Sequence, residues 1–352
     1  MTRISNVCRP LLAKGAGCSP TLCTRIYEAL ASAKVLYALP IVRLSRAKWR
    51  RLGIDHRTFV RSVYGLPRSS QIRPTDAETN TSPSSLRAQQ TALRHALRMH
   101  SAPECKELLT YLQDRPETWF GCNVNLFKEI FGAPPPLHSH PQAPQCRRPP
   151  RVCATLPGLT CKRQTPHGEL QQLVAEKNDD DLQGCLLVYT DGSVMDNGRS
   201  AAAARIAPAL SHHKQCRLPT PASSTIAELA AIHLAADLLS ELPDIRRAAI
   251  LSDSKSALLA IKHAYEGGHT LRLLDHKLAA LSERGCDITL QWIPAHVGIS
   301  ANETADQLAK QVHDPTVPLT SAVSPYDCAR LIIKKHVALH HPDARVAADA
   351  PP

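Results

Sequence analysis

Four acidic side chains in the second half of the chain lie in short, distinctive sequences. Asp191 follows Leu-Leu-Val-Tyr-Thr, Glu228 follows Thr-Ile-Ala, Asp253 follows Ile-Leu-Ser and Asp306 follows Asn-Glu-Thr-Ala. Carboxylate oxygens are hard ligands of the kind that Mg²⁺ prefers. Two such ions about 3.5–4 Å apart can hold the attacking water and the leaving oxygen of a phosphodiester. If the four carboxylates meet at one point, the sequence predicts a two-metal site for cutting nucleic acid.

Each of these acids also has an ordinary explanation. Asp191 could begin a hairpin turn with the glycine after it, and Glu228 could close a capping box at the start of a helix. Asp253 could cap the next helix, and Asp306 could be a solvated position on a helix surface. The prediction of a metal site therefore depends on whether the elements of the fold bring the four residues together.

Residues 183–314 alternate between strand and helix patterns. Short apolar or alternating runs predict strands, and longer runs with helical spacing predict helices. Three antiparallel strands followed by βα units make a mixed five-stranded α/β sheet flanked by helices. The expected strands cover 185–190, 201–207, 214–218, 248–251 and 287–293, and the expected helices cover 225–242, 254–263, 270–284 and 302–312.

This arrangement can bring the four acids to one edge of the sheet. Asp191 and Asp253 both follow buried strands, and ligand sites of open sheets tend to lie beyond the carboxyl ends of strands. Glu228 lies in the first turn of a helix that must pack on that sheet, and Asp306 lies one turn into the last helix. His296 lies in a turn before that helix, where an imidazole could move protons at neutral pH. A structural or solvated histidine is the alternative.

These residues resemble the motifs of the type 1 ribonuclease H family over residues 183–314. The segments Asp-Gly-Ser, Ala-Glu-Leu, Ser-Asp-Ser and His-x-Gly-x-x-x-Asn-Glu-x-x-Asp occur in the order of that family. The resemblance implies a ribonuclease H-like fold and endonucleolytic hydrolysis of the RNA strand of RNA–DNA hybrids, with no small-molecule cofactor. Such sites generally distinguish the hybrid by its 2′-hydroxyls and its minor-groove shape.

The resemblance also implies a role for each matching residue. His296 would assist proton transfer or product release. Two Mg²⁺ or Mn²⁺ ions per site would be held by Asp191, Glu228, Asp253 and Asp306. Residues at positions where relatives contact the hybrid or position ligands are Ser193, Asn197, Ser224, Thr225 and Asn302.

One departure from the family concerns substrate grip. Many cellular relatives carry a basic, Trp-containing protrusion between the second and third helices. Here the corresponding segment, residues 264–269, is short and contains no Lys or Arg. We therefore expect another part of the chain to hold the substrate.

The positive charge of the chain is concentrated at its start. Residues 1–100 contain 17 Lys/Arg and 4 Asp/Glu, whereas the formal net charge of the whole chain is +11. Helical patterns over 21–40, 49–64 and 85–112, without a strand pattern, predict a small basic α-helical module over residues 1–115. Such a module is expected to contact the phosphates of hybrids or of other single- or double-stranded nucleic acid. A merely soluble cationic surface is the alternative.

Proline marks the region after this module. Eight prolines lie between residues 134 and 157, where they disfavour both helices and sheet interiors. We expect residues 116–182 to be a proline-rich linker, with the Asn-Asp-Asp-Asp run at 178–181 as a solvated loop. Residues 315–352 are expected to be a tail with one helix over 326–340.

A second resemblance concerns the first region. Segments 25–40 and 61–68 resemble the part of non-LTR retrotransposon reverse transcriptases that follows the polymerase palm and precedes ribonuclease H. No Tyr-x-Asp-Asp motif is present, so the resemblance implies a truncated open reading frame that does not polymerise DNA. Two alternatives to an active ribonuclease H remain: a catalytically inactive nucleic-acid-binding remnant of a retroelement, and a nuclease or integrase with the same fold.

Composition also bears on where the protein acts. The twelve cysteines include no Cys-x-x-Cys pair, and the chain opens without the apolar segment of a signal peptide. No run reaches the roughly 18 apolar residues of a membrane span. We therefore expect an intracellular protein, nuclear or cytoplasmic, that keeps reduced thiols, is not secreted and does not bind a membrane.

Overall fold

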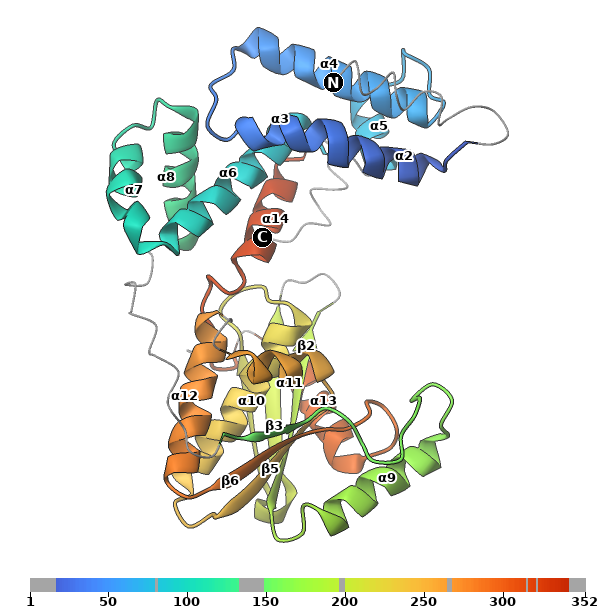
Figure 1. The fold of residues 1–352 in the computed structure, drawn as a ribbon, viewed down its shortest axis with the longest axis vertical. Coiled ribbons are helices and arrows are strands. Elements are labelled where there is room, and N and C mark those ends of the chain that lie inside the picture. Colours follow the sequence, from blue (N-terminus) through green and yellow to red (C-terminus); the bar gives the residue numbers. More distant parts are fainter. Residues whose placement is uncertain are drawn as a thin grey trace. The chain divides into compact units, whose positions relative to one another are not determined.

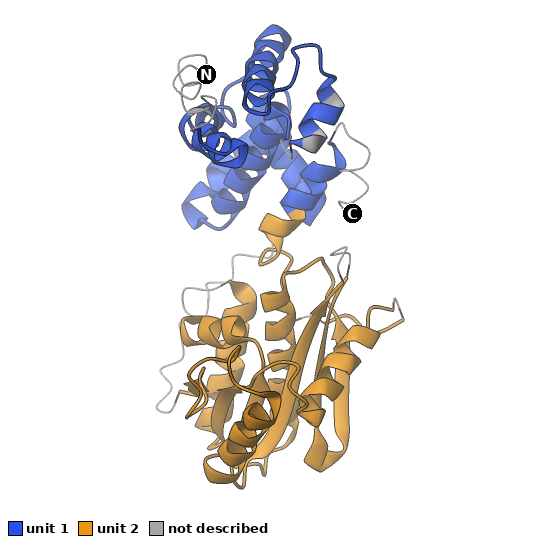
Figure 2. Ribbon diagram, turned by 90° about the vertical axis from the view of Figure 1, so that its right-hand side faces the viewer, with its two compact units in different colours: residues 1–137, 333–352 blue, residues 138–332 orange. Residues whose placement is uncertain are grey.

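The computed structural model (Figure 1) describes residues 17–79, 82–132, 149–195, 200–264, 268–314, 316–320 and 322–341. The chain divides into two compact units, which we call the helical unit, residues 1–137 with 333–352, and the sheet unit, residues 138–332 (Figure 2). Some sequence-based expectations concern positions outside the described residues. These positions are Asn197, residues 265–267 of the short protrusion, 133–148 of the proline-rich stretch, 1–16 of the basic module and 342–352 of the tail.

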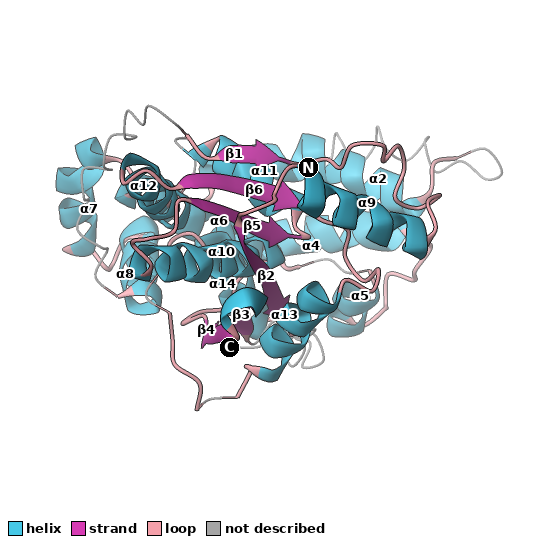
Figure 3. Ribbon diagram, turned by 90° about the horizontal axis from the view of Figure 1, so that it is seen from below, coloured by secondary structure: helices cyan, strands magenta, loops and turns pink. Residues whose placement is uncertain are grey.

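The sheet unit contains a mixed sheet of six strands in the order β1-β6-β5-β2-β3-β4, which Figure 3 shows from one edge to the other. The strands β2, β3 and β4 pair antiparallel, whereas β1, β6, β5 and β2 pair parallel. Their bounds are β1 (Arg151–Cys153), β2 (Leu186–Val194), β3 (Ala201–Ala207), β4 (His212–Arg217), β5 (Arg247–Ser252) and β6 (Asp287–Trp292). The five expected strands are all present, and the predicted mixed sheet flanked by helices is confirmed.

The expected number of five strands is corrected to six. The additional strand, β1, pairs parallel with β6, so that Arg151 lies opposite Thr289 and Cys153 lies opposite Gln291. A strand of three residues beside a run of prolines is too short to show the alternation from which a strand is predicted. It forms because the open edge of β6 offers backbone donors and acceptors to a neighbouring extended segment.

Four helices accompany these strands in the order that the sequence predicts. They are α10 (Ser224–Glu241), α11 (Lys255–Lys262), α12 (His269–Glu283) and α13 (Ser300–Gln311). The helix α10 is apolar on all sides, as expected for a helix that neighbours enclose. It packs on β2 and β3 and against α11 and α12, while α13 also packs on β2 and β3. The core between them is largely aliphatic.

A further helix, α9 (His167–Asp180), precedes β2 and buries two apolar side chains. The acidic run at 178–181, which we expected to be a solvated loop, is helical through its third residue. That expectation was wrong because it considered only the polarity of the run. The side chain of Lys177 pairs with that of Asp181 one turn later, which favours the helical spacing of the two residues.

The segment after residue 314 folds back onto the sheet unit. Asp327 accepts hydrogen bonds from the backbone N–H groups of His269 (3.0 Å) and Thr270 (2.7 Å), at the start of α12. Apolar side chains of the same segment join a buried cluster with α10 and β3. The helix expected in the tail is present as α14 (Ala329–Leu339), and the division between the two units falls within it.

The helical unit contains, in its described residues, helices and no strand. Its elements before α14 are α2 (Pro20–Tyr27), the π-helical η2 (Glu28–Ser32), α3 (Ala33–Ala38), α4 (Arg46–Val63), α5 (Ile72–Glu78), α6 (Ser84–His100), η3 (Pro103–Cys105), α7 (Lys106–Gln113) and α8 (Trp119–Phe131). The helix expected over 21–40 is present as α2, η2 and α3 in succession. The helix expected over 85–112 is broken between α6 and α7, because Pro103 cannot continue α6.

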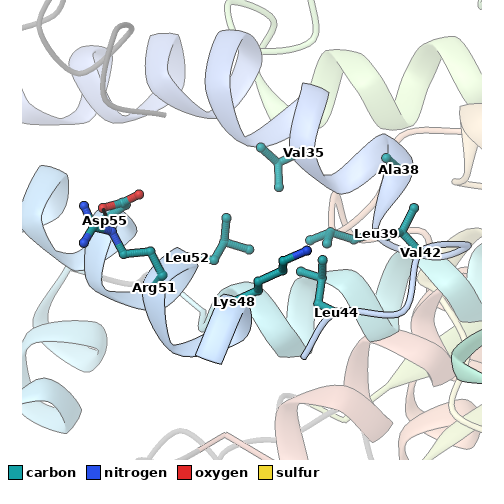
Figure 4. Close-up of a pocket in the computed structure, with 9 residues that line it drawn as sticks. All are labelled: Val35, Ala38, Leu39, Val42, Leu44, Lys48, Arg51, Leu52 and Asp55. Carbon is teal, nitrogen blue, oxygen red and sulfur yellow. Dashed lines mark ion pairs between the residues drawn. The ribbon is translucent and has the colours of Figure 1, made fainter. Parts of the chain in front are cut away.

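The helical unit has a buried core of its own, and part of its apolar surface is exposed. Tyr27 stacks on Phe59 with 3.8 Å between the ring centroids. Tyr37 and Ile41, by contrast, are 79% and 69% exposed. A cavity of about 360 Å³ lies near them, lined mainly by aliphatic side chains such as Leu52 (Figure 4). No helix in the described part of the chain has the length and apolarity needed to cross a membrane.

Candidate metal centre

Three of the four predicted carboxylates meet at one point. Asp191, Glu228 and Asp253 each offer a carboxylate oxygen, and these three oxygens lie within 4.8 Å of one another. The register of the sheet explains part of this meeting. The parallel strands β2 and β5 place Thr190 opposite Ser252, and the next residue on each chain is one of the two aspartates. Asp253, after the end of β5, therefore lies beside Asp191 of β2.

Glycine brings the third carboxylate to the other two. A Cβ atom added to Gly192 would lie 2.3 Å from the backbone N of Glu228, far inside contact distance. Only a residue without a side chain at this position lets the first turn of α10 approach the backbone of β2 so closely. The same close approach holds Glu228 next to Asp191. The glycine of the Asp-Gly-Ser segment therefore has a packing role in assembling the centre.

The ordinary explanations for these acids do not describe what the structure contains. Asp191 lies within β2, paired with Ala204 of β3, and not in the turn of a hairpin. The side-chain caps of α10 and α11 are the hydroxyls of Ser223 and Ser254, which accept the N–H groups of the third helical residues. The three acids are thus left without a capping or turn-forming role.

The meeting of these carboxylates is electrostatically unfavourable. Asp191 and Glu228 are only 6% and 7% exposed. Burial, followed by the charges of Asp253 and Asp306, raises the pKa of Asp191 to about 7. Burial and the neighbouring charge of Asp191 raise the pKa of Glu228 well above its usual value. In the described part of the chain, the Oε2 atom of Glu228 has no hydrogen-bond partner. Buried carboxylates in this state fit a site for cations.

The position of Asp253 is fixed by two neighbours. The indole N–H of Trp292 donates a hydrogen bond of 3.0 Å to the backbone oxygen of Asp253. The side-chain amide of Asn302 donates a long hydrogen bond of 3.5 Å to its carboxylate. Burial raises the pKa of Asp253, whereas this amide and the nearby charges of His296 and Lys162 lower it.

The fourth predicted ligand, Asp306, is near the centre but outside the group of three. Its carboxylate accepts a hydrogen bond of 2.7 Å from Lys310, one turn later in α13, and its side chain is 17% exposed. It is close enough for its charge to raise the pKa of Asp191. Asp306 therefore borders the centre in an ion pair, whereas the other three carboxylates face one another.

His296 lies on an exposed turn beside the centre. Its backbone has a φ of 55°, in the left-handed region that residues with side chains rarely adopt. The turn is closed by Gly298, whose N–H donates a hydrogen bond of 2.8 Å to the carboxylate of Glu303 in α13. The turn thus presents an imidazole at the rim of the acidic centre, close enough to influence Asp253 electrostatically.

The five residues expected to contact substrate or position ligands differ in their surroundings. Asn302 bonds to the acidic centre directly. The hydroxyl of Ser193 bonds to His313 at 3.0 Å, and that of Thr225 bonds to Ser256 at 3.2 Å. Ser224 is exposed as the first residue of α10, and Asn197 lies outside the described residues.

Sequence reasoning missed two cations beside the centre. Lys310 is visible in retrospect, because a Lys four residues after an Asp in a helix commonly pairs with it. Lys162, whose charge acts on Asp253, carried no such signal. It lies in the region that we expected to be linker, 91 positions before that aspartate in the chain.

Comparison with known proteins found one matching family model. The family model for RNase H matches residues 183–314. Among solved structures, the chain is similar to the N-terminal RNase H domain of Rv2228c from Mycobacterium tuberculosis, determined as a fusion with maltose-binding protein. That match has 22% sequence identity and a TM-score of 0.30, and covers 36% of this chain and 98% of the other. No curated protein matches the chain significantly. We call the stretch matched by the family model, residues 183–314, the RNase H domain; it lies within a sheet unit that extends beyond it on both sides.

Proposed function

We propose that this protein is a metal-dependent endonuclease that hydrolyses the RNA strand of RNA–DNA hybrids. The observation that carries the proposal is the convergence of Asp191, Glu228 and Asp253 from three separate elements, within an RNase H domain. Mutually repelling, buried carboxylates are costly to keep, and binding of cations would offset that cost.

The donor set fits Mg²⁺ or Mn²⁺. All three converging groups are hard carboxylate oxygens, and one of them, Oε2 of Glu228, lacks a hydrogen-bond partner among the described residues. We assign these three residues as ligands, with Asp306 as a fourth that would exchange its pairing with Lys310 for the metal site. When bound, the cations would supply the positive charge that activates a water molecule and stabilises the leaving oxygen.

The remaining residues of the centre act by positioning and by moving protons. Trp292 and Asn302 hold Asp253 from its backbone and its carboxylate, so that its orientation is set before substrate arrives. His296, on its exposed turn, would accept or deliver a proton at the rim of the centre and assist product release. Further contacts with the hybrid are proposed for Ser193, Asn197, Ser224 and Thr225.

The helical unit would add affinity. Its charge favours sequence-independent contacts with phosphate, so binding should weaken steeply with salt. In this proposal the chain derives from a retroelement, with residues 1–115 corresponding to the thumb or connection of a reverse transcriptase. The region that we expected to be linker, residues 116–182, contains α8, β1 and α9, so its described residues include regular secondary structure.

The decisive experiment measures cleavage of a labelled RNA–DNA hybrid by purified protein with and without Mg²⁺. Asp253→Asn keeps the shape of the side chain and removes its charge, so it should lower cleavage by at least about 1,000-fold while hybrid binding persists. Asp244→Asn, an exposed position in the same unit, is the matched control. Cleavage that survives Asp253→Asn would refute the proposal. Binding without any metal-dependent product would identify an inactive remnant, and cleavage of duplex DNA would indicate another nuclease of this fold.

A further inference from the structure

The segment before the RNase H domain is built into the sheet unit. The strand β1 extends the sheet through its pairing with β6. The side-chain amide of Gln291, in β6, donates a hydrogen bond of 3.2 Å to the backbone oxygen of Thr155. Leu156 and Val174 are 3% exposed and belong to the main hydrophobic core of the unit. Residues 149–182 are therefore packed into the sheet unit, although they precede the matched domain.

This segment forms a cavity with the turn that carries His296. The cavity has a volume of about 540 Å³, and its walls come from residues 162–170 on one side and 295–297 on the other. Lys162, Arg163, His167 and His296 line it, and none of the lining residues is acidic. Between residues 151 and 167 the chain has three Lys/Arg and no Asp or Glu. The sheet unit thus contains both a basic cavity and the acidic centre.

Two contacts tie the cavity to the candidate active site. The ammonium group of Lys162 donates a hydrogen bond of 3.0 Å to the backbone oxygen of Ala295, the residue before His296. On the other side of the turn, a Cβ added to Gly298 would lie 2.2 Å from the side-chain amide of Gln171 in α9. The turn with His296 is therefore held between α9 and the segment with Lys162. The charge of Lys162 reaches the acidic centre, since it acts on Asp253.

The charge pattern matches a nucleic-acid backbone. Phosphates follow one another along a strand, so a phosphodiester bound at the acidic centre has charged neighbours a few ångströms away. Those neighbours cannot be placed against carboxylates, and they need cations or N–H donors. Lys162 and Arg163 are exposed, and α9 begins at His167, which places the positive end of its dipole at the cavity.

We propose that Lys162 and Arg163 form a subsite for a backbone phosphate that flanks the phosphodiester to be cut, an assignment that rests on the proposed function. The subsite is supplied by the segment before the RNase H domain. It provides, in this chain, a local grip on the substrate close to the reacting bond. Lys162 has a second, positioning role, because its bond to Ala295 holds the turn that carries His296.

The first test compares two double variants of the full chain with equal loss of charge. Lys162→Gln with Arg163→Gln removes the subsite, and Lys214→Gln with Lys262→Gln removes two exposed cations elsewhere in the sheet unit. Each pair is combined with Asp253→Asn, so that hybrid affinity is measured without cleavage. We expect the first pair to raise the Kd about 10-fold or more and to lower the slope of log K against log salt by about 1–2. The control pair should change the Kd less than about 3-fold. Equal effects of the two pairs would overturn the proposal.

The second test locates the phosphate. Hybrids that carry one uncharged methylphosphonate at a time are bound to the protein with and without the two substitutions. If the subsite exists, a methylphosphonate at one position close to the cut lowers the affinity of the protein that has Lys162 and Arg163. The same methylphosphonate does not lower the affinity of the double variant any further. The subsite would be contradicted if, at every position, the methylphosphonate changed affinity equally in the protein and in the double variant.

Two readouts separate the possible failures. Affinity is measured independently of cleavage. The subsite can therefore be refuted while the nuclease activity is kept, and the nuclease activity can be refuted while the subsite is kept. Arg163→Gln alone leaves the bond between Lys162 and Ala295 in place and tests phosphate binding without disturbing the turn. In the protein with Asp253 intact, Arg163→Gln should raise KM with kcat nearly unchanged. A fall of kcat at constant KM would indicate a role in arranging the turn and would overturn the phosphate assignment.

Discussion

The helical unit and the sheet unit use charge in opposite ways. Residues 1–100 carry 17 Lys/Arg against 4 Asp/Glu, and the described cations among them include exposed residues of α4. The RNase H domain, residues 183–314, carries 12 Lys/Arg against 14 Asp/Glu. The acidic excess of the second region is small, but three carboxylates are concentrated at one buried point. Dispersed positive charge favours binding of nucleic acid but does not catalyse a reaction. Concentrated carboxylates can hold catalytic cations, but their mutual repulsion lowers folding stability and disfavours phosphate binding.

The largest expected effect tests whether chemistry is confined to the sheet unit. Glu228→Gln removes a buried carboxylate from the centre, and we expect cleavage to fall by about 1,000-fold or more, equivalent to roughly 4 kcal/mol of transition-state stabilisation. The Kd for the hybrid should change less than about 3-fold, because one repulsive charge near phosphate is lost. Glu241→Gln, at the exposed end of the same helix, is the control. Single-turnover rates and anisotropy titrations give both quantities. Retained cleavage would remove Glu228 from the catalytic set.

A second pair of variants compares how tightly the two units are packed. Gly192→Ala should destabilise the sheet unit by roughly 2–4 kcal/mol, because the new methyl group meets the backbone of α10 and the two elements must separate. Gly53→Ala in α4 meets only the end of the flexible Arg57 side chain, at 3.0 Å. Alanine favours a helix over glycine by about 0.5–1 kcal/mol, so this variant should be neutral or more stable. Denaturation monitored by circular dichroism measures both, and equal destabilisation by the two changes would contradict the difference.

A third set of variants tests how much affinity the helical unit adds to that of the sheet unit. Arg43, Arg46 and Arg50 are exposed cations at and before the start of α4. Changing all three to Gln should weaken hybrid binding roughly 10- to 100-fold at moderate salt and reduce the salt slope by up to about 3. The value of kcat at saturating hybrid should stay within about 2-fold of the starting protein. If kcat falls as much as affinity, the helical unit contributes to catalysis as well as to substrate binding, and the assigned difference between the units is wrong.

The smallest expected effect concerns the cost of the acidic centre without metal. The pKa of Asp191 is raised to about 7, from an unfolded value near 4. A raised pKa means that the folded state prefers the protonated acid, so the contribution of Asp191 to stability is present at about pH 4 and is lost as the pH rises through about 7. Asp191→Asn should therefore raise the free energy of unfolding at pH 8 in EDTA by about 1–2 kcal/mol and flatten its fall between pH 5 and pH 8.

Urea denaturation at several pH values checks this prediction. The stabilisation should shrink or reverse when Mg²⁺ is added, since only the protein with all its carboxylates gains binding energy from the metal. Asp237→Asn removes a partly exposed acid in α10 that pairs with Lys277, and this control should not stabilise the protein at pH 8. A steeper fall of stability with pH in Asp191→Asn would contradict the assigned cause.

The regular part of the fold and the meeting of three of the four carboxylates could be predicted from the sequence. Strands such as β2 and β5 are nearly continuous apolar runs, and α10 is a long apolar helix, so local pattern and final structure agree. Asp191 and Asp253 could be placed because the ends of neighbouring parallel strands lie at the same edge. The place of Glu228 followed from its helix, but the reason for its closeness, the glycine against α10, needed coordinates.

Other features could not be predicted, because they depend on partners distant in the chain. The strand β1 exists through its pairing with β6 and shows no pattern of its own. The pairing of Asp306 with Lys310 competes with the metal ligation that the resemblance implies, and spacing alone does not decide between them. Lys162 reaches the acidic centre only because residues 149–182 pack against the RNase H domain, which a proline-rich sequence does not reveal.

The contact between Asp327 and α12 affects the choice of boundaries for expressed fragments of this protein. A fragment that stops at residue 314 loses the carboxylate that satisfies two backbone N–H groups of α12, a cap of the kind that contributes about 1 kcal/mol. It also loses the apolar cover that the same segment places over α10. The smallest fragment that keeps these contacts is thus longer than the stretch that the family model matches. Insolubility of the shorter fragment would reflect the choice of end point and not an inability of the protein to fold.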